Sequence, residues 1–514
     1  MKNSRRVVQG VFLLLFLFLF LQTESKGRDE LGYPVRLFLD FDPLIFITTL
    51  LSSHSVAPAF YLSLFVVLVT VLLGRVFCGW ICPLGTLNNI AGSLRKSRGG
   101  ERGRGWHRVK YLLLIFLLVS SLFTVQLTGI LDPLSLLIRS LSLSIYPSFE
   151  YGVRALFDSL YHTDAKGIVQ VSEAVFGVVR KGLLSFQQPL FNQGTFIGLL
   201  FLLVLGLNLV EKRFWCRYLC PLGALLGVFS RFSLLKRSVS EGCTECGACA
   251  TVCQGGASPD KKGEWRSAEC YYCANCDDIC PRNAVHFGFA GEKQTAAMDL
   301  GRRRVLVSAL AGAAAVPLLR STPLARAGSR NPELIRPPGS LEEKEFLKRC
   351  VKCGECMKVC TTNGLQPALL EAGWEGIWSP VLVPRIGYCE YRCTLCGQVC
   401  PTGAIKRLDQ KEKARTSIGT VMFDKGRCLP YAHAAPCIVC EEVCPTPKKA
   451  IWLEEVTVRD RSGGEVVVKQ PRVDLELCIG CGICETKCPV LGKPAVSVTS
   501  IGESRSEENR LLLY

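Results

Sequence analysis

The sequence predicts an α-helical membrane domain combined with small α+β domains, held together by cysteine side chains, on either side of the membrane. Three observations lead to this prediction. Hydrophobic residues make up 49% of the 514 residues, more than a soluble chain usually carries. The formal net charge of +17 comes from basic residues that lie largely beside apolar segments, which is typical of cytoplasmic loops and not of a nucleic-acid-binding surface. All 28 cysteines fall in clustered motifs.

Residues 1–228 are expected to form the membrane domain, with about four spans. The apolar runs lie at about 7–21, 59–76, 111–131 and 195–210. The first run is short for a span, but no Ala-x-Ala cleavage site follows it, so we expect a retained helix. The strongly basic loop after the second run is expected to be cytoplasmic. Two apolar stretches, 134–146 and 168–184, are expected to be interfacial helices.

The membrane half contains an internal repeat that ends in a cysteine motif. An Asp-Pro-Leu triplet, an apolar run and a Cys-x-x-x-Cys-Pro motif occur twice, with the triplets at Asp42 and Asp132. The cysteines are Cys78, Cys82, Cys216 and Cys220. Cysteines four apart lie on one side of a helical turn, so two such hairpins could bring four thiolates to one site. A shared metal cluster, a redox-active thiol pair and a structural role all remain open.

Residues 229–297 contain two runs of four cysteines with the spacing of a bacterial two-cluster ferredoxin. The runs are Cys243, Cys246, Cys249, Cys253 and Cys270, Cys273, Cys276, Cys280, the second followed by Pro281. In this arrangement three closely spaced thiolates bind three irons of one [4Fe-4S] cluster, and the fourth cysteine of the run binds the neighbouring cluster. We therefore assign Cys280 to the first cluster and Cys253 to the second. Zinc would favour two separated cysteine pairs.

Residues 298–328 have the parts of a twin-arginine export signal in the middle of the chain. Arg302 and Arg303 precede an apolar run from Val307 to Leu319, and Ala325 and Ala327 have the spacing of a cleavage site. This segment is expected to be an internal signal or anchor helix recognised by the twin-arginine translocase. An ordinary membrane helix with a basic flank is the alternative.

Residues 329–502 contain four further cysteine runs, which predict four more [4Fe-4S] clusters in an exported domain. The runs are Cys350, Cys353, Cys356, Cys360; Cys389, Cys393, Cys396, Cys400; Cys428, Cys437, Cys440, Cys444; and Cys478, Cys481, Cys484, Cys488. Disulfide frameworks do not repeat such a spacing four times. In comparable four-cluster proteins the first run pairs with the fourth and the second with the third, but adjacent pairing also fits the sequence. Residues 456–458 and 466–468 predict a β-hairpin before the last run.

With these motifs, residues 1 to about 290 resemble a NapH-type membrane subunit, and residues 298 to about 500 resemble a NapG/MauM-type exported ferredoxin. The second resemblance includes Ile335-Arg336-Pro337-Pro338-Gly339 and the segment from Gly387 to Tyr391. It implies a quinol dehydrogenase-type electron-transfer subunit of the bacterial inner membrane. The expected domains are a multi-pass membrane part, a cytoplasmic two-cluster ferredoxin and a periplasmic four-cluster polyferredoxin.

The expected function is electron transfer from the membrane quinone pool, through six [4Fe-4S] clusters, to a periplasmic cytochrome or reductase. The alternative is an electron donor for assembly of a periplasmic metalloenzyme or its cofactor. The sequence places no quinone site and gives no catalytic residue. Cysteine spacing also leaves the direction of electron flow open, because cluster potentials span from about -700 to about +450 mV.

Overall fold

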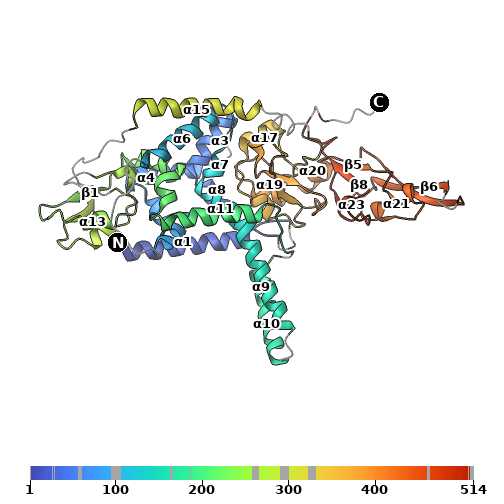
Figure 1. Cartoon of the computed structure of the whole chain (residues 1–514), viewed down its shortest axis with the longest axis horizontal. Coiled ribbons are helices and arrows are strands. Elements are labelled where there is room, and N and C mark those ends of the chain that lie inside the picture. The colour runs from blue at the N-terminus through green and yellow to red at the C-terminus, as the bar shows by residue number, and fades with distance from the viewer. Residues whose placement is uncertain are drawn as a thin grey trace. The chain divides into compact units, whose positions relative to one another are not determined.

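The computed structural model describes residues 2–509 except 26, 28, 56–60, 94–105, 163–165, 186, 258–264, 290–299, 322–330, 460–462 and 507–508. The chain forms two compact units, each assembled from separate stretches (Figure 1). Unit 1 contains Met1–Gln22, Tyr33–Leu141 and Thr195–Leu318, and unit 2 contains Thr23–Gly32, Ser142–Gly194 and Leu319–Tyr514. The Ala-x-Ala spacing and most of the basic loop lie outside the described residues.

Unit 1 is mainly helical and carries the first two cysteine runs in a small α+β segment at its end. Its elements are α1 (Lys2–Gln22), α2 (Leu37–Asp40), α3 (Pro43–Ser53), α4 (Tyr61–Leu73), η2 (Phe77–Ile81), α5 (Pro83–Ser93), α6 (His107–Leu122), α7 (Thr128–Leu131), α8 (Pro133–Ser140), α11 (Gly194–Gly206), η4 (Leu207–Leu209), η5 (Trp215–Leu219), α12 (Pro221–Ser230), β1 (Lys236–Val239), α13 (Ala248–Thr251), η6 (Ser267–Glu269), α14 (Asn275–Asp278), β2 (Val285–Gly288) and most of α15 (Arg302–Arg320).

Unit 2 combines a helical hairpin with the four C-terminal cysteine runs. Its elements are η3 (Leu141–Ile145), α9 (Tyr146–Tyr161), α10 (Lys166–Gly182), α17 (Glu343–Arg349), α18 (Glu355–Lys358), β3 (Leu365–Pro367), η7 (Trp374–Gly376), β4 (Pro380–Leu382), α19 (Leu395–Val399), α20 (Gln410–Arg415), β5 (Thr420–Phe423), α21 (Leu429–Ala432), α22 (Val439–Glu442), β6 (Ile451–Arg459), β7 (Glu465–Val473), α23 (Ile483–Thr486) and β8 (Val496–Thr499).

The prediction of a four-span membrane domain is wrong. Among the described residues, α1 is the one helix that is long and apolar enough to cross a membrane. The other predicted spans are shorter helices: α4 and α11 have 13 residues each and α6 has 16. A span needs about 20 residues, and 13 residues rise only about 20 Å. The apolar runs overestimate helix length because Gly74, at φ +75°, follows the end of α4 and α11 tightens into η4.

The sheets are small and flank the cysteine runs. All four sheets among the described residues are antiparallel pairs, namely β1–β2, β3–β4, β5–β8 and β6–β7. The β5–β8 pair joins a strand before the third C-terminal run to a strand after the fourth run, with Val421 opposite Val498. The predicted hairpin is confirmed, since β6 and β7 pair over nine residues with Val458 opposite Val466 (Figure 1).

The internal repeat has the same local structure in both copies. Asp42 and Asp132 are the N-cap residues of α3 and α8, and each carboxylate accepts backbone N–H groups of the first helical turn. Each Cys-x-x-x-Cys-Pro motif then forms one π-helical turn, η2 or η5, that contains the first cysteine. The second cysteine precedes a proline that begins the next helix, α5 or α12. The repeat in the sequence is therefore a repeat in the backbone.

Candidate functional site: cysteine-lined cavities and a four-thiol site

The six cysteine runs share a backbone shape that turns their thiols inward. In every run the third cysteine lies in a one-turn helix: α13, α14, α18, α19, α22 or α23. In the four regularly spaced runs, the residues on both sides of the second cysteine have positive φ, as Glu245 (54°) and Gly247 (71°) do. The two runs with a longer first gap lack this pair of left-handed residues among their described backbone angles. The Cys-x2-Cys-x2-Cys spacing therefore corresponds to a specific alternation of backbone handedness.

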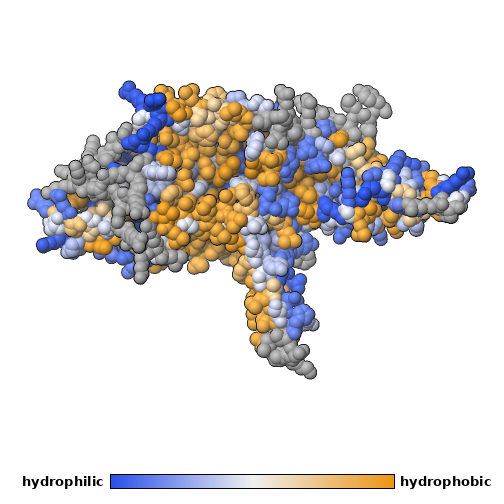
Figure 2. Space-filling view, viewed as in Figure 1, coloured by the Kyte–Doolittle hydropathy of each residue, from blue (hydrophilic) through white to orange (hydrophobic). Residues whose placement is uncertain are grey.

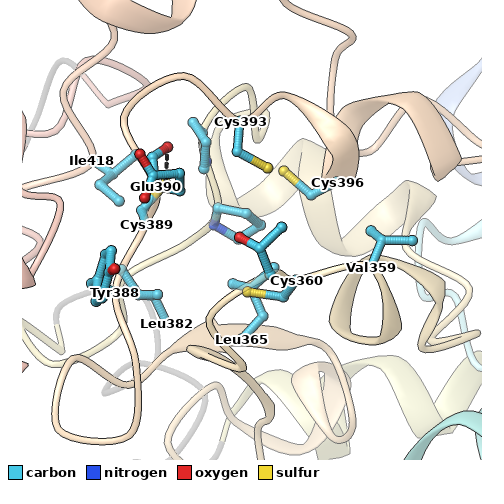
Figure 3. A pocket seen from close by; sticks show the side chains of 13 residues that line it. Val359, Cys360, Leu365, Leu382, Tyr388, Cys389, Glu390, Cys393, Cys396 and Ile418 are labelled. Atoms are coloured by element: carbon cyan, nitrogen blue, oxygen red, sulfur yellow. Dashed lines mark hydrogen bonds between the residues drawn. The ribbon is translucent and has the colours of Figure 1, made fainter. Parts of the chain in front are cut away.

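Three cavities in unit 2 are each lined by four cysteines. Figure 3 shows one of them, where Cys360 faces Cys393 and Cys396 from a different run, and Cys389 completes the set. This cavity is otherwise lined mostly by apolar side chains. The second contains Cys350, Cys353, Cys356 and Cys400, and the third contains Cys444, Cys478, Cys481 and Cys484. In each cavity, three cysteines come from one run and the fourth from its neighbour.

The structure therefore has adjacent pairing of the four C-terminal runs, first with second and third with fourth. The remaining set follows the same rule. Burial raises the pKa of Cys428, and the nearby Cys437 and Cys488 thiols raise it further, so Cys488 lies with the third run. In unit 1, burial and the Cys273 and Cys253 thiols raise the pKa of Cys270, so Cys253 lies with the second run. Of the first run, Cys246 is exposed and Cys243 partly buried.

The cysteine sets fit [4Fe-4S] clusters better than single metal ions. Within the described ranges, no group of three or more His, Cys, Asp or Glu side chains converges on one ion. The thiolates of a cluster instead stand apart around a cube of iron and sulfide. Burial raises the pKa of thiols such as Cys356 and Cys396, so each must lose a proton when iron binds. Burial lowers the pKa of Lys413, but the neighbouring Cys389 and Cys396 raise it overall and keep a positive charge near the thiolates.

The two Cys-x-x-x-Cys-Pro motifs meet in unit 1 and form what we call the four-thiol site: Cys78, Cys82, Cys216 and Cys220. Burial raises the pKa of Cys82, and the nearby Cys216 and Cys78 thiols raise it further. Burial likewise raises the pKa of Cys220, and the nearby Cys216, Cys78 and Cys82 thiols raise it further. Burial also raises the pKa of Cys216, against the effect of Arg213 and Arg75 close by. The structure thus brings all four motif cysteines together.

A buried charged network lies beside this site, and the sequence did not indicate it. Glu269, directly before Cys270, accepts hydrogen bonds from Lys110 Nζ and from the Tyr111 hydroxyl (2.7 Å), and it lies 3.5 Å from Arg75. Lys110 is fully buried, and burial lowers its pKa to about 8 although Glu269 acts in the opposite direction. The basic loop predicted after the second apolar run extends to Lys110. An acidic residue next to a cluster cysteine was the available signal for this contact.

Two segments of unit 2 that precede the cysteine runs in the chain bind to them directly. Asp29 accepts hydrogen bonds from the backbone N–H (2.6 Å) and hydroxyl (2.8 Å) of Thr394, at the start of α19. Lys358, at the end of α18, donates to the Thr23 carbonyl (2.7 Å) and lies over the Tyr146 ring. The first two C-terminal runs are thus packed against residues 23–32 and the start of α9. Because the contacting residues lie far apart in the chain, the sequence did not predict these contacts.

Comparisons with known proteins point to the same chemistry. A family model described as a 4Fe-4S binding domain matches residues 57–100 and 193–240, and a second model with that description matches 471–491. The chain is 37% identical to the methylamine utilization ferredoxin-type protein MauM of Methylorubrum extorquens over 196 residues, which are 37% of this chain and 82% of MauM. It is 34% identical to the ferredoxin-type protein NapG of Escherichia coli over 215 residues, 40% of this chain and 89% of NapG. No solved structure matches.

Proposed function

Because this chain belongs to the family of ferredoxin-type iron-sulfur electron-transfer proteins that includes NapG and MauM, we propose that it carries electrons from quinol to a periplasmic redox protein. Six [4Fe-4S] clusters, bound by the six cysteine runs, would form the route. We also propose that residues 1 to about 290 act as the NapH-like, quinol-facing part of the same chain. The matches of the 4Fe-4S model at 57–100 and 193–240 support this assignment.

The observation that carries the proposal is the exchange of fourth cysteines between neighbouring runs. When bound, a [4Fe-4S] cluster supplies one-electron transfer at a potential set by its surroundings. Adjacent runs exchange ligands: in unit 2, Cys360 of the first C-terminal run lines the cavity of the second run, and Cys400 of the second run lines the cavity of the first. The chain also adjusts the surroundings of the thiols. Backbone N–H groups donate to Cys253 Sγ (3.3 Å) and Cys400 Sγ (3.4 Å), and Lys413 adds positive charge next to Cys389.

Membrane attachment is part of the proposal, with α1 as the anchor. The first residues of α1 contact the segment that carries the first two runs: Lys2 pairs with Asp278 at 2.6 Å, and Arg5 donates to Asn275 Oδ1 at 3.3 Å. A basic start of the span and the two-cluster segment therefore lie together, which supports a cytoplasmic position for both. Apolar side chains gather on the surface of unit 1 (Figure 2), including Phe65 and Leu68 of α4 and Leu199 and Leu202 of α11. This surface supports contact with lipid.

The periplasmic location of residues 329–502 rests on the twin-arginine pattern. Arg302 begins α15, and the helix continues through the apolar run to Arg320. A domain whose clusters are loaded in the cytosol must be exported folded, which the twin-arginine route provides. Replacing Arg302 and Arg303 with lysine should leave the C-terminal runs inaccessible to protease added to spheroplasts. Continued cleavage from the periplasmic side would contradict export by this route.

Electron transfer from quinol can be measured on the full chain. The protein, purified anaerobically in detergent, should lose its cluster absorbance when reduced quinol is added, as it should with dithionite. A Cys396→Ala variant, which lacks one ligand of a C-terminal cavity, should show a smaller change with both reductants. Bleaching by dithionite but not by quinol would contradict quinol oxidation. It would favour the alternative function, electron supply during assembly of a periplasmic metalloenzyme, which requires no quinol turnover.

A further inference from the structure

The four cysteine sets of unit 2 follow one another in a row. Along the row they are set A (Cys350, Cys353, Cys356, Cys400), set B (Cys360, Cys389, Cys393, Cys396), set C (Cys444, Cys478, Cys481, Cys484) and set D (Cys428, Cys437, Cys440, Cys488). Sets A and B exchange cysteines, and so do sets C and D. The backbone N–H of Cys389 donates to the carbonyl of Cys481 at 2.8 Å, which joins set B to set C. Set D therefore lies at one end of the row, and α19, α23 and α21 follow one another in this order in Figure 1.

The opposite end of the row is covered by a segment from an earlier part of the chain. Three thiols of set A are each 8% exposed, namely those of Cys350, Cys353 and Cys356. The cysteines of set B are partly exposed, but Asp29 accepts hydrogen bonds from Thr394, which lies between two of them. Lys358, between two cysteines of the first run, donates to the carbonyl of Thr23. Residues 23–32 therefore occupy the surface beside sets A and B.

Set D reaches the surface of unit 2. Three of its cysteines are partly exposed: Cys437, Cys440 and Cys488. Two large apolar side chains beside them are open to solvent, since Ile438 is 51% exposed and Leu491 is 89% exposed. Exposed apolar side chains of this kind form the centre of many protein–protein contacts. Because electron transfer slows steeply with distance, a partner that takes electrons from this row gains most by docking at set D.

Positive charge surrounds these apolar side chains. Residues 424–449 and 487–493 contain six basic and three acidic residues, so this end of unit 2 attracts negative charge. Five of the basic residues are exposed lysines: Lys425, Lys448, Lys449, Lys487 and Lys493. The sixth, Arg427, donates to the carbonyls of Leu491 (3.3 Å) and Lys493 (3.0 Å). Arg427 thus holds the loop after the last cysteine of set D against the segment before its first cysteine.

We propose that Ile438, Leu491 and the five surrounding lysines form an exit surface that docks an acidic electron-carrier protein. The inference rests on the proposed function, in which electrons travel along the cysteine sets. One electron leaves the reduced cluster at set D and reduces one oxidised haem of the carrier. The carrier presents acidic side chains around an apolar edge of its haem. Electron-transfer contacts are small, often below about 1,200 Å², which suits a surface with two exposed apolar side chains inside a charged rim.

An anionic lipid surface fits the same residues less well. It would attract the lysines, but membrane-surface binding also needs an amphipathic helix with a continuous apolar face. Ile438 directly precedes α22, which has four residues, and Leu491 lies in a loop. Two isolated apolar side chains give little area to bury in a bilayer, whereas they are enough for the centre of a small protein contact.

Binding of a c-type cytochrome in two charge states tests the exit surface without any electron transfer. Succinylation converts the lysines of a basic cytochrome into carboxylates, so the native and the succinylated form differ in surface charge and share one fold. The oxidised full chain in detergent at low salt should bind the succinylated form at least about tenfold more tightly than the native form. Salt at about 0.15 M, where the Debye length is about 8 Å, should weaken this binding.

Two matched sets of substitutions locate the contact. Neutralising three exposed lysines of the exit surface should weaken binding of the succinylated form by about tenfold. The changes are Lys448→Gln, Lys487→Gln and Lys493→Gln. The control loses the same charge at three exposed lysines around the first two runs and should stay within about twofold of the wild type. The control changes are Lys344→Gln, Lys406→Gln and Lys411→Gln.

The apolar centre is tested by Leu491→Ser, which should weaken binding by about threefold or more. Leu369→Ser, at a leucine that is 46% exposed and lies between the first two runs, should leave binding unchanged. Equal binding of the two cytochromes by the wild type, or an equal loss in the two lysine variants, would overturn the exit surface. A lysine variant that loses binding to vesicles of anionic phospholipid, but keeps its affinity for the succinylated cytochrome, would overturn it as well.

Stopped-flow mixing separates this inference from quinol oxidation. Protein reduced with dithionite, then freed of the excess, should reduce the succinylated cytochrome faster than the native one. Cys437→Ser combined with Cys440→Ser should slow haem reduction while the remaining clusters still bleach. Fast haem reduction by dithionite-loaded protein that quinol does not bleach would support the exit surface and contradict only the quinol source. Bleaching by quinol without any reduction of the succinylated cytochrome would overturn only the exit surface.

Discussion

The buried Arg336 is expected to hold the C-terminal cysteine domain together, and Arg336→Met tests this directly. Arg336 is 1% exposed and lies in the Ile-Arg-Pro-Pro-Gly segment that precedes the first C-terminal run. It donates to both carboxylate oxygens of Glu343 (2.6 and 3.1 Å), to the Ser379 hydroxyl (2.8 Å) and to the Pro380 carbonyl (2.7 Å). Its guanidinium also lies 4.6 Å from the centre of the Phe346 ring.

The loss of stability expected for Arg336→Met depends on which partners the buried Glu343 carboxylate keeps. Breaking a buried ion pair costs about 3–5 kcal/mol when the remaining charge has no partner. Glu343 keeps Arg505, whose Nη1 lies 2.9 Å from Oε2, so the loss belongs at the lower end, about 3 kcal/mol. Since about 1.4 kcal/mol changes a rate tenfold, unfolding should accelerate by about 100-fold if the contacts are absent from the transition state.

The assay is the rate at which cluster absorbance disappears in guanidinium under anaerobic conditions. A rate is the appropriate measure because cluster loss is irreversible. Arg505→Met is the matched control: it removes the other, less buried partner of Glu343 and should accelerate unfolding by a smaller factor. An Arg336→Met rate within about threefold of the wild type would refute the view that this ion pair stabilises the domain.

Three further predictions follow from unit 2. If the first and second C-terminal runs exchange fourth cysteines, the Cys350→Ala and Cys400→Ala changes should together remove one cluster, whereas Cys350→Ala with Cys488→Ala should remove two; equal counts in native mass spectrometry would contradict adjacent pairing. Although burial raises the pKa of Glu343, Arg336 and Arg505 lower it overall, so its stabilising effect is present above the unfolded value of 4.5 and is lost as the pH falls below it. The advantage of the wild type over Arg336→Met in guanidinium should therefore shrink below about pH 4.5, and a constant ratio of rates would exclude this linkage. Gly387→Ala should destabilise by about 1–3 kcal/mol and weaken cluster retention, because its Cβ would lie 2.0 Å from a carbonyl oxygen, whereas Gly152→Ala, in open space on α9, should leave iron content unchanged.

The prediction of membrane spans failed where local composition was a poor guide to helix length. The apolar runs at 59–76 and 195–210 are real, and they form α4 and α11. Hydropathy does not record where a helix ends, however: Gly74, with its positive φ, follows α4 after 13 residues, and α11 tightens into a 3-10 turn after 13 residues. The buried Lys110 illustrates the same limit, since a lysine next to an apolar run looks like a loop residue until its partner Glu269 is found far away in the chain.

The iron-sulfur chemistry of this protein could be predicted from the sequence alone, because ligand spacing is a local property. Six cysteine runs, the repeated Cys-x-x-x-Cys-Pro motif and the hairpin of β6 and β7 all depend on residues close together in the chain. Which distant residues contact one another became visible only in the folded chain. Adjacent pairing of the runs, the gathering of four thiols around two buried arginines, and the binding of Asp29 to Thr394 all join segments separated by dozens to hundreds of residues. Such contacts depend on packing and burial across the whole unit, which no local pattern specifies.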